Sequence, residues 1–163
     1  MEKRVILKNK NYDIMYHVSP LLKKAQQDDE QSLDRKRFIG NDLVVIVFKE
    51  QSDKNDLFDP TIIESKMNQI FIVVSPTTDK ETNQSYTVSV ISKESVIPFP
   101  PFIKPTEMLP IIPIFPHNEQ LKTFMMNKII NAEKTALLSD NFNRTKTRVL
   151  QSQVQSVIDQ FGK

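Results

Sequence analysis

Two short apolar runs constrain the fold of this chain most. One is LVVIVF at Leu43–Phe48 and the other is QIFIVVS at Gln69–Ser75. Both are rich in β-branched residues and apolar on both faces, a pattern typical of strands that are covered on both sides of a sheet. We therefore expect Leu43–Phe48 to be a central strand. Tyr86–Ser92 alternates apolar and polar residues and predicts a half-exposed strand beside them.

Helix signals lie between and after these runs. Asp28–Ile39 has acidic residues in its first turn and basic residues in its last, which suits the helix dipole, and Gly40 can take the positive φ that ends a helix. A second helix is expected at Pro60–Met67, with Asp59 as its N-cap. From residue 117 to 161 the apolar spacing is helical, with an interruption at Ser139–Asn143.

The remaining segments complete an α/β outline. Asp13–Ser19 and Arg4–Leu7 read as strands, and Pro98–Pro116 holds seven of the ten prolines, so it should cross the surface in extended form. We predict one domain over residues 1–163, with a mixed central sheet of about five strands, flanking helices and a long C-terminal helical segment. A chain of this length buries roughly two-thirds of its unfolded surface.

Composition excludes several functions. The chain has no cysteine, which removes disulfides, thiolate catalysis and cysteine zinc sites, and its two histidines make a histidine metal site improbable. With only two glycines, Gly40 and Gly162, it has no glycine-rich phosphate loop. A net charge of +2 does not suggest a nucleic-acid groove. The longest apolar run is about six residues and the first eleven are basic and polar, so we expect a cytoplasmic protein without membrane insertion.

Several segments carry motifs in a consistent order. Ile14–Ser19 reads IMYHVS, Glu30–Phe48 reads EQSLDRKRFIGNDLVVIVF, and Phe124–Glu133 reads FMMNKIINAE. Further matching segments are Ile70–Val74, Tyr86–Val90, the proline-rich Val96–Pro101 and Arg144–Leu150. In order and spacing they resemble the catalytic domain of the Rap/Ral GTPase-activating family, which includes the GTPase-activating (GAP) domain of tuberin. The 19-residue block Glu30–Phe48 is the most specific of them.

This resemblance implies a function in which the chain has no active site of its own. Members of the family use no arginine finger; the asparagine of the G-N-D segment, here Asn41, enters the site of a GTP-bound Ras-like small GTPase and helps to place the attacking water. The implied partner-binding residues are Arg35, Arg37, Phe38 and Asp42. No cofactor or metal is implied, and the resemblance leaves open whether the GTPase is Rap, Ral or Rheb.

Three departures from the family pattern leave alternatives open. Phe38 stands where the family usually has histidine, so it is a candidate for packing as well as for binding. No glycine follows Phe99, and the family's glycine-rich opening strands and separate dimerisation domain are not found ahead of Ile14. A pseudo-GAP that binds a GTPase without accelerating hydrolysis is the first alternative. An unrelated α/β scaffold that binds an extended peptide or its own copy is the second, and Gly40–Asp42 would then be an ordinary helix-exit turn.

Overall fold

The computed structural model describes residues 5–9, 11–21, 33–50, 57–63, 65–77, 85–103 and 114–161. The chain divides into two compact units. Unit 1 comprises Met1–Asp42 and Thr61–Asn68, and unit 2 comprises Leu43–Pro60 and Gln69–Lys163. The class is α/β, as predicted, with a mixed four-stranded sheet, a separate two-stranded sheet and a long C-terminal helix.

Unit 1 contains a strand pair and a helix. Strands β1 (Val5–Asn9) and β2 (Tyr12–Tyr16) are antiparallel, with Val5 opposite Tyr16, and a 3-10 turn, η1 (Ser19–Leu21), follows at the predicted Ser-Pro break. Helix α1 spans Leu33–Asn41. The start of the predicted Asp28–Ile39 helix lies outside the described residues. The predicted strand at Asp13–Ser19 is shorter, because β2 ends at Tyr16.

The predicted role of Gly40 as a left-handed helix terminator is wrong. Helix α1 continues through Gly40 to Asn41, and no described glycine has a positive φ. The helix closes instead with a hydrogen bond from the Asp42 amide to the Ile39 carbonyl, at 3.3 Å. Side chains from a later segment of unit 1 take up other carbonyls of this last turn, so the backbone needs no left-handed residue there.

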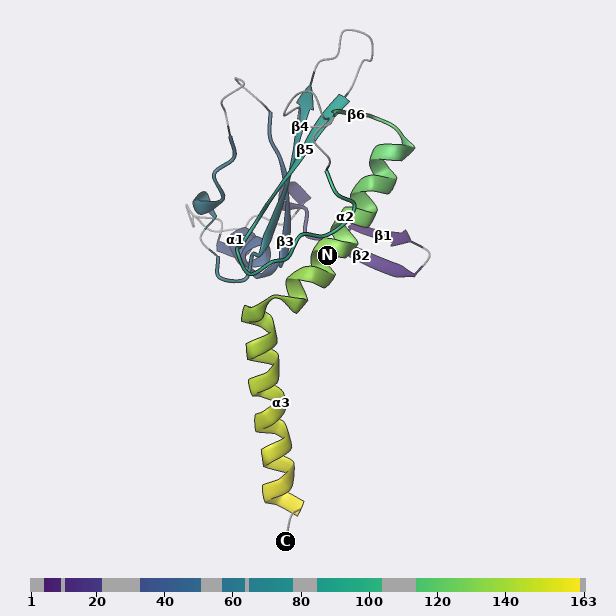
Figure 1. Ribbon diagram of the computed structural model, residues 1–163. Coiled ribbons are helices and arrows are strands. Elements are labelled where there is room, and N and C mark those ends of the chain that lie inside the picture. Colours follow the sequence, from purple (N-terminus) through teal and green to yellow (C-terminus); the bar gives the residue numbers. More distant parts are fainter. Residues whose placement is uncertain are drawn as a thin grey trace. The chain divides into compact units, whose positions relative to one another are not determined.

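Unit 2 is built on the four-stranded sheet (Figure 1). Its strands are β3 (Val44–Phe48), β4 (Ile70–Thr77), β5 (Ser85–Ser92) and β6 (Ile114–Pro116), in that order across the sheet. Strands β3 and β4 are parallel and the other neighbours are antiparallel. The sheet is mixed, as expected, but the strands before Leu33 pair with each other in a separate sheet.

The prediction that Leu43–Phe48 is a central strand is wrong. Strand β3 is an edge of the sheet formed by the described strands, and the Phe48 side chain is 61% exposed. The inner strands are β4 and β5, and Ile70 and Ile72 of β4 are fully buried. Apolar residues on both faces of a run therefore fit an edge strand here, because β-branched residues suit any pleated surface and not only a doubly covered one.

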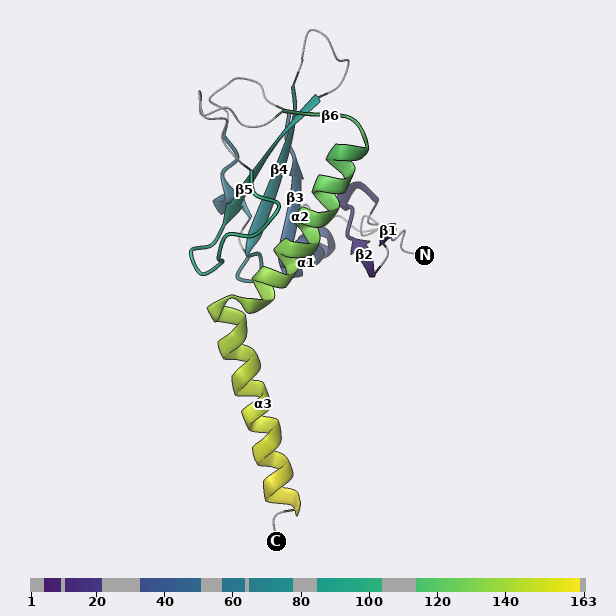
Figure 2. The same ribbon diagram turned by 45° about the vertical axis from the view of Figure 1, so that its right-hand side comes forward.

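Helix α2 (Glu119–Leu138) covers one face of this sheet (Figure 2). Asn118 caps its first turn, since its side-chain oxygen accepts hydrogen bonds from the amides of Gln120 and Leu121. Ala132 and Ala136 lie fully buried against the sheet. Their small side chains allow the helix to approach the sheet closely. The buried core cluster consists of Leu43, Ile70, Ile72, Val88, Val96, Phe99, Ala132 and Ala136.

The predicted interruption of the C-terminal helices is confirmed at Ser139. Its backbone is extended, its hydroxyl donates to the Ala136 carbonyl at 2.7 Å, and α3 (Asp140–Phe161) starts directly after it. A helix was also predicted at Pro60–Met67, but the described part contains only the 3-10 turn η2 (Pro60–Ile62). No helix within the described ranges combines the length and apolar character that spanning a bilayer requires.

A buried lysine fixes the first part of the proline-rich crossing. The Lys128 ammonium on α2 donates to the carbonyls of Phe99, at 2.9 Å, and Pro101, at 3.1 Å, and lies 4.0 Å from the centre of the Phe99 ring. Asn131 donates to the Pro100 carbonyl at 3.0 Å. The charge is thus buried on carbonyl dipoles and an aromatic face, and burial lowers the pKa of Lys128. Residues 104–113 of the crossing lie outside the described residues, and its end forms the edge strand β6.

Candidate functional site

Asn41 lies at the end of α1, at the centre of the G-N-D turn (Gly40–Asp42). The residue is exposed, whereas Gly40 and Asp42 on either side of it are half-buried. Directly after the turn, Leu43 is buried and its carbonyl accepts hydrogen bonds from the amides of Gln69 and Ile70 at the start of β4. The chain therefore presents the asparagine to solvent while the residues on both sides of it are held.

Ser65 and Asn68 brace the backbone of this turn from within unit 1. The Ser65 hydroxyl donates to the Gly40 carbonyl at 2.5 Å and accepts from the Asn68 amide at 3.2 Å. The Asn68 carboxamide nitrogen donates to two carbonyls, that of Ile39 at 2.8 Å and that of Asp42 at 2.5 Å. Asn68 is only 1% exposed, so these two bonds are shielded from water and costly to lose. Three of the carbonyls around Asn41 thus have fixed donors.

The Asp42 carboxylate is held by a histidine that follows β2. His17 Nδ1 lies 3.0 Å from each of the two Asp42 carboxylate oxygens, with both side chains partly buried. An ionised carboxylate only accepts hydrogen bonds, so Nδ1 carries the proton and donates. On its other side the His17 ring contacts the Phe38 ring, with 5.0 Å between the ring centres. His17 therefore links two of the predicted partner-binding residues, Phe38 and Asp42.

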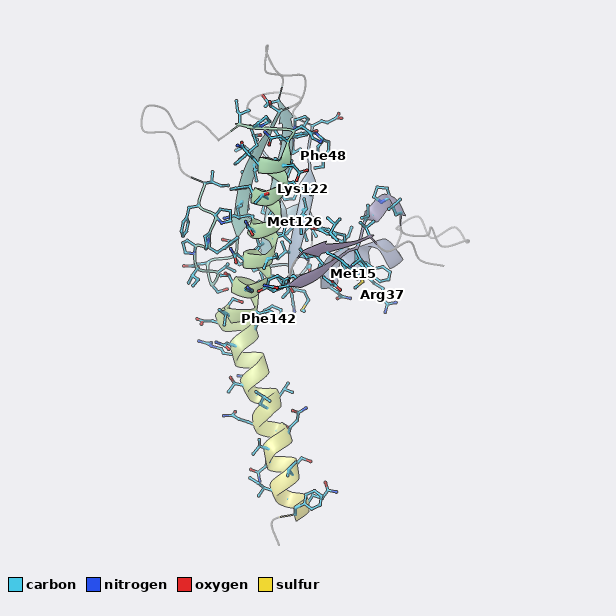
Figure 3. All side chains as sticks on the ribbon, turned by 90° about the vertical axis from the view of Figure 1, so that its right-hand side faces the viewer. Met15, Arg37, Phe48, Lys122, Met126 and Phe142 are labelled. Carbon is cyan, nitrogen blue, oxygen red and sulfur yellow. The ribbon has the colours of Figure 1, made fainter. Side chains whose placement is uncertain are left out.

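The basic residues of α1 differ in what the structure describes. Arg37 is exposed, and Figure 3 shows its side chain pointing away from the α1 ribbon. Arg35 lies in the same helix, but its side chain is outside the described residues. Phe38 is half-buried against His17 and so has a packing role whether or not it also contacts a partner. The five predicted site residues lie within eight positions on α1 and the turn that follows it.

Chemically, this arrangement suits a residue that acts on another molecule. The site presents one exposed carboxamide, which can donate and accept at the same time. Its neighbouring titratable groups, His17 and Asp42, are engaged with each other, which leaves Asn41 as the exposed polar group at the tip of the turn. A neutral amide cannot serve as an acid or base in the way that a carboxylate can, but it can orient a water molecule or an oxygen atom.

The family of the chain follows from a match along nearly its whole length. A model of the Rap/ran-GAP family matches residues 2–151. This chain belongs to the Rap/ran-GAP family. The family prediction made from the motifs is therefore confirmed, and the G-N-D turn lies well inside the matched region of this Rap/ran-GAP chain.

Curated relatives agree with the family match. The chain is 34% identical over 146 residues to the human GTPase-activating Rap/Ran-GAP domain-like protein 3. This alignment covers 90% of this chain and 13% of the relative. It is 35% identical over 152 residues to the human signal-induced proliferation-associated 1-like protein 2, covering 93% of this chain and 8% of the relative. A GTPase-activating protein of Dictyostelium discoideum is 35% identical over 151 residues, or 91% of this chain and 14% of the relative. This Rap/ran-GAP chain thus spans about one-seventh or less of the length of these relatives.

A solved structure shares the fold. The structure of the TSC2 (tuberin) GAP domain aligns with a TM-score of 0.63 and 23% sequence identity, over 83% of this chain and 65% of that one. At this identity the likeness concerns the fold of the Rap/ran-GAP chain.

Sequence reasoning missed the two residues that brace the turn. Ser65 lies 25 positions from the carbonyl that it binds, and Asn68 lies 26 or more from its two. Ser65 falls within the predicted Pro60–Met67 helix and Asn68 directly after it. Their residue types are common in such stretches, so no local pattern marks them. The only sequence signal is the position of Asn68 just before the buried β4 strand of this Rap/ran-GAP chain, close to where β3 must begin in a parallel pair.

Proposed function

We propose that this chain is a GTPase-activating protein for a Ras-like small GTPase, with Rap or Ral as the first candidates. It binds the GTP-bound form in the cytoplasm and inserts Asn41 into the nucleotide site. Membership of the Rap/ran-GAP family and relatives that are named GTPase-activating proteins support this proposal. The observation that carries it is the exposed Asn41 on a turn whose neighbouring carbonyls are held by buried or partly buried side chains.

The asparagine contributes by position and by hydrogen bonding. Its carboxamide accepts a proton of the attacking water and donates to an oxygen of the GTPase or of the γ-phosphate. Acceleration of about 10³–10⁵-fold corresponds to roughly 4–7 kcal/mol of barrier. A side chain supplies such an effect only if it is already oriented when the partner arrives, because motion at the reacting centre forfeits the advantage of positioning. The braced turn supports that requirement.

Binding is assigned to the surface around the same helix. Arg35 and Arg37 face a partner that carries a polyphosphate and acidic switch residues, so they steer and hold it by charge. Phe38 and Asp42 complete the proposed contact, although both also have partners within unit 1. The chain supplies these residues in trans and needs no active site or cofactor of its own for this role.

The second candidate is a pseudo-GAP, and Phe38 is the observation that favours it. The family usually has a histidine at this position, which donates and accepts hydrogen bonds. Phenylalanine does neither, and here its ring packs on His17. If the histidine contributes to catalysis in the family, this chain binds a GTPase with little acceleration of hydrolysis.

A panel of purified GTPases separates these candidates. Rap, Ral and Rheb are loaded with GTP, and phosphate release is followed with and without the chain, beside a binding measurement with a non-hydrolysable GTP analogue. A GAP binds at least one of the three and accelerates its hydrolysis by about 10³-fold or more. Binding without acceleration selects the pseudo-GAP. Failure to bind any Ras-like GTPase contradicts both and returns the chain to the class of α/β scaffolds.

A further inference from the structure

The second half of α3 carries an apolar stripe that the described residues leave uncovered. Every residue from 147 to 161 is exposed, and Figure 1 shows α3 (yellow-green to yellow) continuing beyond the end of α2 in unit 2. The α3 stripe consists of Leu150, Val154, Val157, Ile158 and Phe161. Their side chains are between 50% and 73% exposed. Among the described side chains of α3, that of Phe142 near its start packs against the core.

The spacing of the α3 stripe is that of a coiled-coil seam. Leu150, Val154, Val157 and Phe161 follow one another at intervals of four, three and four residues, which places them at successive d and a positions of a heptad repeat. Val154 and Phe161 take a positions, and Leu150 and Val157 take d positions. Valine at a and leucine at d favour two-stranded pairing.

The flanking residues are neutral and permit such pairing. Positions e and g beside the seam hold Gln151, Gln153, Gln160 and Ile158, so no like charges meet when two such helices pair. The opposite face is polar and partly satisfied within the helix, since Gln155 donates to Asp159 at 2.8 Å. Between residues 149 and 161 the only charged residue is Asp159. A helix that binds an anionic membrane would instead carry lysine and arginine on its polar face.

The area of the stripe matches the lower limit for a dimer. Covering what these five side chains expose would bury on the order of 500 Å² on each helix, or about 1,000 Å² for a pair, which is about the smallest area of a specific interface. Isolated helices shorter than about 12–15 residues are marginal in water, and most helical stability in proteins comes from packing of an apolar face. Pairing would therefore provide the second half of α3 with packing that the described residues of unit 2 do not supply.

We propose that the α3 stripe pairs with the same stripe on a second copy of this chain, forming a weak, reversible two-stranded coiled coil. The interface is apolar and short, so association depends on concentration and is nearly independent of salt. The inference rests on α3 alone and is independent of the proposed action of Asn41.

Sedimentation equilibrium of the whole chain tests the pairing. Between about 5 and 500 µM the average mass is expected to rise from 18.9 kDa towards twice that value, and to do so equally at low and high salt. The double variant Val154→Asp, Val157→Asp is expected to weaken association by about 10-fold or more. The matched control Ser152→Asp, Ser156→Asp adds the same two charges on the opposite face of the helix and should change it by less than about 2-fold.

Three results would overturn the proposal. The first is a monomer at every concentration. The second is association that the stripe variant and the control weaken equally. The third is a monomer whose thermal stability falls in the stripe variant but not in the control, which would show that the stripe is covered within one chain. If the aspartate pair prevents folding, Val154→Gln provides a milder disruption of the same seam, with Ser152→Gln as its control.

Discussion

His17 Nδ1 lies 3.0 Å from both carboxylate oxygens of Asp42, the residue that directly follows Asn41. A side chain just after β2 thereby holds one side of the G-N-D turn, while Ser65 and Asn68 bind carbonyls of the turn and of the residue before it. The proposed catalytic asparagine is thus supported by two segments of unit 1 that are distant from it in sequence, one at His17 and one at residues 65–68. Its own side chain remains exposed at the tip of the turn.

The pairing of His17 with Asp42 can be measured by a double-mutant cycle. His17→Phe removes the donor and keeps a ring against Phe38, and Asp42→Asn removes the charge. Because the pair is partly exposed, we expect a coupling energy of about 1 kcal/mol in urea unfolding of the four proteins. His17→Phe should also lower GTPase activation by about 10-fold, since a loosened turn misplaces Asn41. Additive effects on stability would show that the two residues do not interact in solution.

Asn68 is expected to matter more for stability than an asparagine on the surface. Asn68→Leu removes both donors and leaves the carbonyls of Ile39 and Asp42 without their partner, at a cost of about 1–3 kcal/mol. The control is Asn131→Leu, which breaks one exposed bond to Pro100 and should cost less than about 1 kcal/mol. Chemical denaturation of both variants decides. Equal losses of unfolding free energy in the two variants would mean that the Asn68 hydrogen bonds stabilise the chain no more than an exposed one does.

Gly40→Ala should stabilise the chain. The glycine lies within α1 without a positive φ, and a Cβ at this position would meet the Ser65 side chain at 4.0 Å, an ordinary contact. Alanine in a helix is favoured over glycine by roughly 0.5–1 kcal/mol. The free energy of unfolding, measured in urea, should therefore rise by that amount, and the melting temperature should rise with it. A clear loss of stability would indicate that the turn needs the freedom of glycine after all.

The sequence predicted the helices and strands themselves better than it predicted which of them pair and pack together. The strands at Ile70–Thr77 and Ser85–Ser92 and the break at Ser139 follow from local patterns, because side-chain period and capping chemistry act within a few residues. The edge position of β3 depends on which strands pair, and the same β-branched run fits either place. The prediction that Gly40 ends the helix with a positive φ failed for a related reason. The donors to the carbonyls of Gly40 and Ile39 come from residues 65 and 68, which are distant in sequence.

The candidate site shows the same division. Asn41 and its neighbours were found through motifs of a family whose match is confirmed, and their roles remain predictions. Their supports were not found, because Ser65 and Asn68 reach the turn only through the tertiary fold. The same holds for Lys128, whose burial against the Phe99 ring could not be inferred from a helical stripe.

Lys128 should give stability a distinctive dependence on pH. Burial lowers its pKa below the ordinary value of 10.5, so between the folded-state pKa and 10.5 the unfolded chain binds more protons than the folded one. The contribution of Lys128 to the free energy of unfolding therefore rises with pH across that interval. We expect the free energy of unfolding of the wild type, minus that of Lys128→Met, to increase as pH rises towards 10.5.

Lys122→Met is the control for this measurement. Lys122 lies on the same helix, but its side chain is 68% exposed and pairs with Glu119 at the surface. Its replacement should change stability by less than about 0.5 kcal/mol, with no comparable dependence on pH. A difference for Lys128→Met that stays constant or shrinks as pH rises would contradict the lowered pKa.

The central claim is that Asn41 acts on the bound GTPase, and single-turnover phosphate release at saturating chain tests it most directly. Asn41→Ala is expected to remove the acceleration almost entirely while affinity for the GTP-bound partner changes by less than about 3-fold, because the contact is made mainly in the transition state. Asn127→Ala, which removes an exposed asparagine from α2, should leave both quantities unchanged. If the Asn41→Ala protein accelerates GTP hydrolysis as much as the wild type does, Asn41 does not act on the bound GTPase.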